Sequence, residues 1–505
     1  MRIYILYFLI ATGLLTFVTG CYKDKGNYNY VPVNTVTISG IDSSYTVDYG
    51  QPFTLTPTLL LSKDSVNNTY DSTKYSYEWI AINPGALKAS QKTLLATTRD
   101  LNTKITLAPT RYTVYYRITE KSTGIQWQQT FYLVVSTTVY EGWLILCNVN
   151  DSSRLDMLSY KDGKYRTIVN VLDTVGSGLP PQGKPYSVTY SPYSPTTTGI
   201  YICTQTGTNR VDQNYFKWSS NLNIKYEMLS TVPDNFTADF ISLGSTSQTQ
   251  YMLANKNFYY YYYSFNIYFG LPINQISGEN GTFTPAPFIA PGQNINGAIL
   301  YDQDHQRFVK HVVSSTSCIP ITADSSLFSF TPRKSMRYMT FTPYGGGEVF
   351  SVLKDDQTGK SYLARFTFTD KSLQQTYYAE VTGTDFDKAE QFAVSPNLGY
   401  LFYSVGGKVY EYDMGLQQSI LMLDKGGDQV SLLKFHRFVS SKYSLGTTAP
   451  LLANKLIVGS YSKTKPEGSN GTMELYAVPQ VNGALQLYES YTGLGKIVSV
   501  GYRER

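Results

Sequence analysis

The sequence of 505 residues is poor in histidine and in charge. It holds three histidines, His305, His311 and His436, and Asp, Glu, Lys and Arg together form 16% of it. None of the histidines stands in an HExxH motif, and neither a GxSxG motif nor a phosphate-binding P-loop occurs. On a single strand, His305 and His311 would lie about 20 Å apart. This shortage argues against the motif-based hydrolases and nucleotide-binding enzymes, and it predicts structural or exposed histidines.

Cysteine is also scarce, and the net charge is small. Of four cysteines, Cys147, Cys203 and Cys318 lie far apart in the sequence, and none belongs to a CxxC pair. A disulfide framework or a zinc site needs closer, paired spacing, so we expect buried free thiols, with one disulfide among the three left open. The formal net charge of +5 provides no basic stripe of the kind that binds nucleic acid.

An apolar segment opens the chain, directly after a single cation, Arg2. It ends in Val-Thr-Gly-Cys at residues 18–21, which resembles a lipobox, where small residues precede the thiol that accepts diacylglycerol. The segment is short for a membrane span, which needs about 20 apolar residues. We therefore expect residues 1–20 to be a signal peptide, Cys21 to be the lipidated N-terminus, and residues 21–30 to be a polar tether. An uncleaved anchor helix is the alternative.

Residues 31–137 have the pattern of a β-sandwich. The chain holds 46 tyrosines and 39 glycines, a composition that favours strands and tight turns. Short runs such as residues 75–80 and 112–118 alternate apolar and polar side chains, with turn formers between them. About 105 residues with such strands suit an immunoglobulin-like sandwich. Trp79, on a middle strand, is expected to fill the space between the sheets.

Residues 138–505 repeat a pair of strands joined by a Gly or Asn turn. Clear copies lie at residues 399–413 and 455–478. The copies start about 40 to 60 residues apart, which predicts a β-propeller of roughly seven blades, with six or eight as alternatives. No amphipathic helix of four turns is evident. The expected fold class is therefore all-β, with an N-terminal Ig-like sandwich followed by a propeller.

Two stretches of the N-terminal region carry a family resemblance. Tyr77-Glu78-Trp79 matches the Tyr-x-Trp core strand of PKD-like domains, and residues 21–28 read Cys-Tyr-Lys-Asp-Lys-Gly-Asn-Tyr. Together with the repeats, these stretches make the chain similar to the PKD-like family lipoproteins of Bacteroidota. The resemblance implies a lipoprotein of a nutrient-uptake locus, placed beside a Sus-type transporter as an accessory that captures or handles ligand at the cell surface.

Aromatic side chains are the candidates for ligand binding. Residues 258–265 contain five consecutive tyrosines. Alternate rings of a strand face opposite sides, so one set is able to stack on a sugar or a peptide. Tyr259, Tyr261 and Tyr263 form one such set, and Tyr186 stands in a second aromatic cluster. We expect these four tyrosines to line a ligand platform, and packing between blades is the alternative.

Two acidic turns are candidates for a calcium site. Residues 302–304 read Asp-Gln-Asp and residues 354–356 read Lys-Asp-Asp, so both offer the carboxylate oxygens that Ca²⁺ prefers. Aspartate is also favoured in turns, where its carboxylate forms local hydrogen bonds. We expect the turn role, and no cofactor.

The combined patterns predict a non-catalytic binding protein at the outer membrane and on the cell surface. Lipid on Cys21 would hold the protein to the membrane, the propeller would contact a glycan or peptide ligand or a Sus-type transporter, and the sandwich would act as a spacer. Adhesion to host or neighbouring-cell polymers is one alternative, and it would involve no transporter. A propeller hydrolase or lyase that works with carboxylates and tyrosines is the other. No nucleic-acid partner is expected.

Overall fold

The structure is a computed structural model, and it divides the chain into two compact units, residues 1–135 and 136–505. Almost all of its elements are β-strands, which confirms the predicted all-β class. The predicted signal peptide, Cys21 and the tether lie outside the described residues. Within the described ranges, no helix is both long and apolar enough to cross a membrane. These ranges are 33–63, 71–83, 92–161, 163–192, 198–245, 248–265, 267–292, 297–322, 326–370, 372–438 and 448–504.

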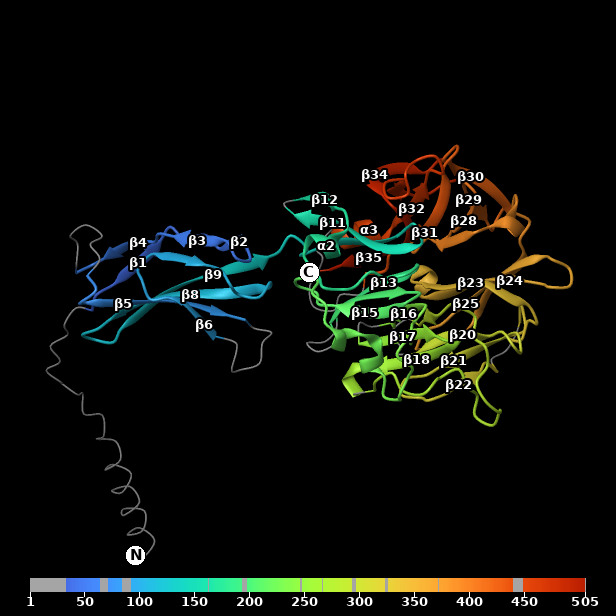
Figure 1. The fold of residues 1–505 in the computed structure, drawn as a ribbon, viewed down its shortest axis with the longest axis horizontal. Helices are drawn as coiled ribbons and strands as arrows, with labels where there is room; N and C mark the ends of the chain where they lie inside the picture. The colour runs from blue at the N-terminus through green and yellow to red at the C-terminus, as the bar shows by residue number, and fades with distance from the viewer. Residues whose placement is uncertain are drawn as a thin grey trace, which may run out of the picture. The chain divides into compact units, whose positions relative to one another are not determined.

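The first unit consists of one large antiparallel sheet and two short strand pairs (Figure 1). The pairs are β1 (Val36–Ser39) with β4 (Thr58–Leu61), and β3 (Pro52–Leu55) with β7 (Leu101–Lys104). The five-stranded sheet has the order β2 (Ser44–Asp48), β9 (Gln126–Ser136), β8 (Arg111–Glu120), β5 (Tyr75–Ile82) and β6 (Lys92–Ala96). A single hydrophobic cluster takes residues from both the large sheet and the strand pairs.

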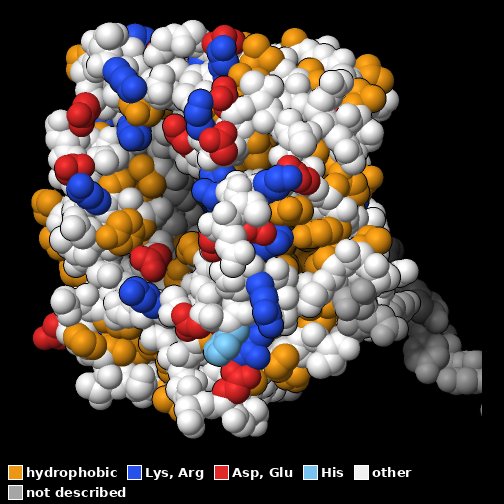
Figure 2. Space-filling model, turned by 90° about the vertical axis from the view of Figure 1, so that its right-hand side faces the viewer, with side chains coloured by type: hydrophobic (Ala, Val, Ile, Leu, Met, Phe, Trp, Pro, Cys, Tyr) orange, Lys and Arg blue, Asp and Glu red, His pale blue; other side chains and the backbone are white. Residues whose placement is uncertain are grey.

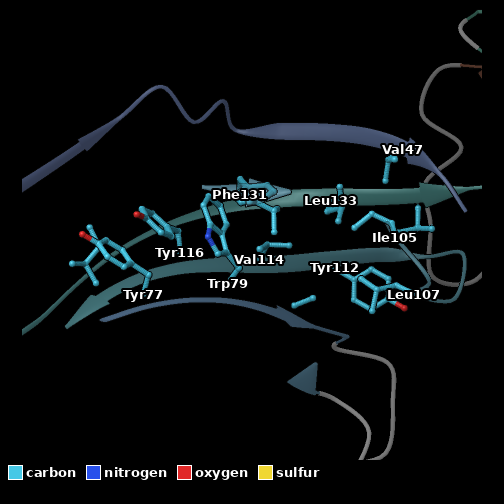
Figure 3. Packing of buried hydrophobic residues seen from close by; sticks show 14 of the residues in the cluster. Val47, Tyr77, Trp79, Ile105, Leu107, Tyr112, Val114, Tyr116, Phe131 and Leu133 are labelled. Carbon is cyan, nitrogen blue, oxygen red and sulfur yellow. The ribbon is translucent and has the colours of Figure 1, made fainter. Parts of the chain in front are cut away.

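Trp79 lies at the centre of this cluster, as predicted. It is fully buried on β5, opposite Tyr116 of β8, and the two rings stack with centroids 4.1 Å apart. Figure 3 shows Phe131 of β9 beside them, with its ring centroid 6.3 Å from that of Trp79. The indole N–H donates to the carbonyl of Thr98 at 2.9 Å, so the ring is buried without losing its hydrogen bond. Alternation along β5 and β8 therefore builds the core of the first unit.

The described part of the second unit contains seven antiparallel sheets, which we number in chain order (Figure 1). Sheet 1 consists of β12 (Lys164–Ile168), β11 (Ser152–Lys161), β10 (Gly142–Val149) and β35 (Lys496–Arg503). Sheet 2 consists of β13 (Pro185–Ser191), β14 (Gly199–Thr204) and β15 (Gly207–Val211). Sheet 3 consists of β16 (Phe240–Leu243), β17 (Thr249–Ala254) and β18 (Asn257–Tyr262). Sheets 4 and 5 are β19 (Ala290–Pro291), β20 (Ala298–Asp302), β21 (Arg307–His311) and β22 (Cys318–Pro320); and β23 (Ser335–Thr342), β24 (Glu348–Lys354), β25 (Ser361–Thr367) and β26 (Gln375–Glu380). Sheets 6 and 7 are β27 (Gln391–Val394), β28 (Leu401–Val405), β29 (Lys408–Asp413) and β30 (Gln418–Asp424); and β31 (Gln429–Lys434), β32 (Lys455–Tyr461), β33 (Gly471–Ala477) and β34 (Gln486–Leu494). The short helices α2 (Val171–Thr174) and α3 (Thr448–Ala453) lie in connections.

Apolar clusters join each of these sheets to the next. Leu146 of sheet 1 packs in one cluster with Ile202 of sheet 2, and six further clusters continue the series. The last of them joins sheet 7 back to sheet 1, where Trp143 shares a cluster with Ile457. Sheet 1 itself takes β35 from the end of the chain, with Trp143 opposite Tyr502. The second unit is therefore β-propeller-like, with both faces of its sheets buried.

Candidate functional site

The first strands of successive sheets enclose a cavity, which we call the central cavity. In sheet 1 this place is taken by β35, which contacts β13 and β31. The cavity has two adjoining compartments of about 350 and 560 Å³, and both are lined by Thr340, Phe341 and residues 434–437. Figure 2 shows a hollow in one face of the protein, with Lys and Arg side chains along its edge. Volumes of this size suit a small ligand.

The walls of the central cavity combine aromatic rings with polar groups. Phe341, Phe435 and Tyr502 supply rings, and Thr189 and Ser499 supply hydroxyls that already hydrogen-bond within the protein. The Thr189 hydroxyl donates to the carbonyl of Ile241 at 2.6 Å, and the Ser499 hydroxyl accepts from the N–H of Val188 at 3.1 Å. These bonds link neighbouring first strands, and they fix the shape of the wall.

Three basic residues follow one another at the end of β31. Lys434 is the last residue of that strand, and His436 and Arg437 follow it after Phe435. The Lys434 ammonium donates to the carbonyl of Val500 at 2.6 Å, and the Arg437 guanidinium donates to the carbonyl of Gly244. These bonds to carbonyls on other sheets hold both cations at the cavity wall.

The charges of these residues have been removed from bulk water. Burial lowers the pKa of Lys434 to about 8 and that of Arg437 to about 10. The pKa of His436 falls well below its ordinary value because of burial and because of the two neighbouring cations. All three side chains retain some exposure to the cavity itself. The site is thus a deep, electropositive wall.

No carboxylate forms an ion pair with Lys434 or Arg437 among the residues that the structure describes. Glu504 is the one carboxylate in the described lining of the cavity. The His436 ring lies edge-on to Trp143, with centroids 5.5 Å apart, and its Nδ1 has no hydrogen-bond partner in the described part of the chain. The cavity therefore presents two cationic groups, Lys434 and Arg437, that no carboxylate pairs with in the described part of the chain.

This basic group is the site that sequence reasoning missed. We predicted structural or exposed histidines: His305 is exposed, the buried His311 contacts the Tyr251 hydroxyl at 3.0 Å and the Ser315 carbonyl at 2.9 Å, and His436 packs edge-on against Trp143 and Phe438. Burial lowers the pKa of His311 to about 4, so it is neutral at pH 7. The signal that could have found this basic group was Lys-Phe-His-Arg-Phe at residues 434–438, where basic and aromatic residues are interspersed at the end of a strand.

The predicted ligand tyrosines lie in a different place from the central cavity. Tyr259 and Tyr261 are only 8% and 3% exposed, and both pack in the cluster between sheets 2 and 3, with Tyr263 half-buried against it. Tyr260 and Tyr262 fill the cluster on the other face, between sheets 3 and 4. Tyr186, at 38% exposed, belongs to neither cluster. The structure does not gather the four predicted rings on one surface, because sheet 3 is covered on both faces.

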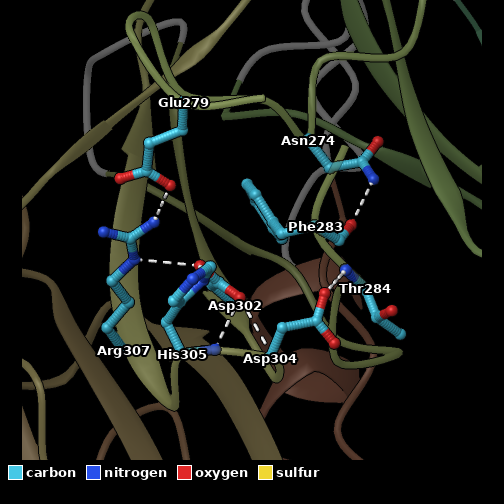
Figure 4. Close-up of polar contacts among 8 residues, drawn as sticks. All are labelled: Asn274, Glu279, Phe283, Thr284, Asp302, Asp304, His305 and Arg307. Carbon is cyan, nitrogen blue, oxygen red and sulfur yellow. Dashed lines mark hydrogen bonds and ion pairs between the residues drawn. The ribbon is translucent and has the colours of Figure 1, made fainter. Parts of the chain in front are cut away.

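The acidic turns have the structural role that we predicted for them. Asp302 is fully buried and accepts hydrogen bonds from the N–H groups of Asp304 and His305 at 3.0 and 3.1 Å (Figure 4). It also contacts His305 Nδ1 at 2.8 Å and Arg307 Nε at 2.9 Å. Arg307 bonds in turn to Glu279, and this bond lowers the pKa of that carboxyl. One carboxylate thus organises the turn between β20 and β21.

The same device recurs in three other sheets. Asp212, Asp355 and Asp413 stand at or just after the end of a strand, and each accepts from the N–H groups two and three positions later, as Asp302 does. These are the local bonds for which aspartate is favoured in turns. Within the described ranges, no group of three or more His, Cys, Asp or Glu side chains is suited to a metal.

The three cysteines of the second unit are buried and free. Burial raises the pKa values of Cys147 and Cys318 well above the ordinary value of a thiol. It raises the pKa of Cys203 to about 11. Thiolates are the reactive form, so we expect no labelling of these thiols by Ellman's reagent at pH 8 in a folded Cys21→Ser variant. The same sample in guanidinium should release three equivalents. Labelling of the native protein at the rate of a small thiol would contradict the buried placement.

Known proteins match the two units to different extents. The first unit is a sandwich built around Trp79. Residues 21–185 match the model of the PKD-like family. This match confirms the predicted resemblance for the first part of the chain, and it extends past the first unit to the start of β13. No curated protein matches the chain.

Solved structures similar to this chain cover most of its length at low identity. A quinonprotein alcohol dehydrogenase-like protein from Bacteroides thetaiotaomicron shares 11% identity, covers 91% of this chain and 96% of its own, and has a TM-score of 0.37. A DUF4784 family protein from Bacteroides caccae shares 8% identity over 93% of this chain and 98% of its own, with a TM-score of 0.32. AztD from Citrobacter koseri shares 7% identity over 85% and 98%, with a TM-score of 0.34.

Proposed function

We propose that the protein is a non-catalytic binding protein that holds a small ligand in the central cavity of a seven-bladed β-propeller. The observation that carries the proposal is the cavity itself, which is enclosed by the first strands of successive sheets and lined by rings, hydroxyls and basic groups. The seven sheets are the proposed blades. Two observations support ring closure: the cluster that joins sheet 7 to sheet 1, and the pairing of β10 with β35.

A binding role suits the described lining better than acid–base catalysis does. Glycoside hydrolysis generally uses two carboxylates about 5–10 Å apart, one of them as acid and the other as base or nucleophile. Glu504 has no second carboxylate beside it among the described lining residues, and basic side chains take the remaining charged positions. We therefore propose capture of the ligand without its conversion.

We further propose that the N-terminal region holds this binding activity at a membrane surface. Cys21 carries the lipid, residues 21–30 form the tether, and the PKD-like sandwich acts as the spacer. Two or three acyl chains, at about 0.8 kcal/mol per buried CH₂, anchor a protein stably. The protein then serves as an outer-membrane, surface-exposed accessory of a Sus-type uptake system for glycans or peptides, and the match of residues 21–185 to the PKD-like family supports this assignment.

Lipidation is tested by replacement of the acylated thiol. The Cys21→Ser variant should be lost from the outer-membrane fraction, since no acyl chain is then attached, and wild-type protein should stay there after a high-salt wash. Mass spectrometry of the wild-type N-terminus should find diacylglycerol on Cys21 and no trace of residues 1–20. An unmodified Cys21 in the wild type, or retention of the variant in the outer-membrane fraction, would overturn the anchor.

The partner is tested by gentle detergent extraction of the tagged full-length protein from outer membranes. A Sus-type transporter pair should co-purify with wild-type protein and be absent after extraction of the Cys21→Ser cells. Co-purification of host or neighbouring-cell polymers alone would instead favour adhesion. Turnover of a glycan or peptide by the purified protein would contradict a purely binding role.

A further inference from the structure

Lys434 and Arg437 both line the two compartments of the central cavity. They come from sheet 7, while the carbonyls that they bond belong to Val500 of sheet 1 and Gly244, which follows the first strand of sheet 3. Residues of sheet 7, sheet 1 and the end of the first strand of sheet 3 therefore hold the two cations at the wall of the central cavity. A carbonyl acceptor orients a cation without cancelling its charge.

Two cations in such a position are costly unless an anion accompanies them. A buried charge loses several kcal/mol of hydration, and opposite charges normally sit beside it for that reason. Elsewhere in the second unit, Arg154, Arg210 and Arg365 all have a carboxylate partner within 3 Å. Lys434 and Arg437 have no such partner in the described part of the chain. Arg337 shares this feature, since its guanidinium donates to the carbonyls of Phe386, Asp387 and Ala389, but it lies outside the described lining of the cavity.

The one carboxylate in the described lining, Glu504, does not neutralise both cations. Glu504 supplies one negative charge to the first compartment and does not line the second. Were it paired with either cation, the pKa of that cation would rise, whereas burial lowers both. Even with Glu504 ionised, Lys434, Arg437 and Glu504 together leave one positive charge among the described residues that line the cavity.

We propose that the central cavity binds the carboxylate of an acidic sugar through Lys434 and Arg437. This inference rests on the proposed function and names the ligand class. The Arg437 guanidinium provides the planar pair of donors that matches a carboxylate, and Lys434 adds a point charge. Phe341 and Phe435, which are only half-buried, offer apolar faces to a sugar ring. Each compartment has the volume of a site for one or two sugar units.

The test compares two disaccharides that differ only at C6 of each sugar, where one has a carboxylate and the other a hydroxymethyl group. Digalacturonate and its neutral counterpart, digalactose, are titrated calorimetrically into the full folded chain at low and at moderate salt. Digalacturonate should bind at least ten-fold more tightly than digalactose, and the difference should shrink as salt increases. The Lys434→Met/Arg437→Met double variant should lose ten-fold or more of the affinity for digalacturonate and keep the same weak affinity for digalactose.

A stability measurement accompanies the binding assay, because a misfolded variant would also lose binding. Removal of unbalanced buried charge should leave the melting temperature of the ligand-free double variant unchanged or raise it. Lys408→Met, at an exposed position of sheet 6, is the matched control and should alter neither quantity. A lower melting temperature in the double variant would show that the two cations support the fold, and it would overturn the inference.

The other outcomes separate the inference from the proposed function. Equal binding of the two disaccharides, unaffected by the double substitution, would overturn the anionic class and leave cavity binding in place. If inorganic sulfate binds as tightly as digalacturonate does, the cavity is a simple anion site, and the assignment of a sugar ligand is overturned. Absence of all binding would overturn the inference, while co-purification with a transporter separately decides the accessory role.

Discussion

Replacement of Asp302 by alanine should lower the free energy of unfolding of the second unit by about 3–5 kcal/mol, the range for a buried ion pair that loses one partner. The carboxylate is fully buried, and four hydrogen-bond contacts from three residues converge on it. After its removal, two backbone N–H groups and the Arg307 guanidinium lose an acceptor. Arg307, whose side chain is 14% exposed, then keeps only Glu279 as a charged partner.

Denaturant unfolding followed by tyrosine and tryptophan fluorescence measures this loss. Asp413→Ala is the matched control, because Asp413 makes the same two turn bonds to Gly415 and Leu416 but is partly exposed and has no buried cation beside it. It should cost about 1 kcal/mol, the value of ordinary hydrogen bonds. Equal losses in the two variants would mean that the buried Arg307 contributes nothing to the effect of Asp302.

Replacement of Glu411 by glutamine should stabilise the second unit above pH 7 by about 3 kcal/mol. Glu411 is 1% exposed on β29, and neither of its carboxylate oxygens has a hydrogen-bond partner in the described part of the structure. Burial, helped by the charge of Asp413, raises its pKa from 4.5 to about 7. At about 1.4 kcal/mol for each pH unit, that difference is the cost of ionising the folded protein.

The pH dependence of stability gives the sign of this effect. Below pH 4.5 the carboxyl is neutral in both the folded and the unfolded protein, so Glu411 costs nothing. Between pH 4.5 and about 7 the unfolded chain releases its proton while the folded protein retains it, and stability falls as pH rises. Above about pH 7 the loss is complete. The Glu411→Gln variant should lack this decline, so the two stability curves should converge near pH 4 and separate toward pH 8.

Glu348→Gln is the matched control for this second prediction. The Glu348 side chain is also buried, at 6% exposed, but it forms an ion pair with Arg365 at 2.8 Å. Its replacement should destabilise the unit at pH 8, since Arg365 then keeps its charge without a partner. Stabilisation by both substitutions would indicate that the pH effect reflects net charge and not the specific environment of Glu411.

Much of the fold follows from local patterns in the sequence. Alternation along residues 75–80 correctly placed Trp79 between the sheets of the sandwich, because a strand with one covered face must alternate. Aspartates at strand ends such as Asp302 were predicted as turn residues on the same kind of local argument. These features depend on neighbours within a few residues, and one sequence contains that information.

The site depends instead on which sheets meet. The tyrosine run at 259–263 was expected to expose one face, but sheet 3 has neighbours on both sides, and the rings alternate between two clusters. Lys434 and Arg437 become a site only because the carbonyls of Val500 and Gly244 lie beside them in space. Neither the stacking order nor these long-range contacts can be read from spacing along one chain.

The pairing of β10 with β35 also constrains how the second unit reaches its final state. Tyr502 donates to Glu141 at 2.9 Å across 361 residues of sequence, so sheet 1 gains its fourth strand only after the polypeptide has been synthesised almost to residue 503. Contacts over such a separation form late, and unpaired strand edges invite aggregation in the meantime. A chain of this design would therefore depend on chaperones to protect the edge of β10 until its last strand is available for pairing.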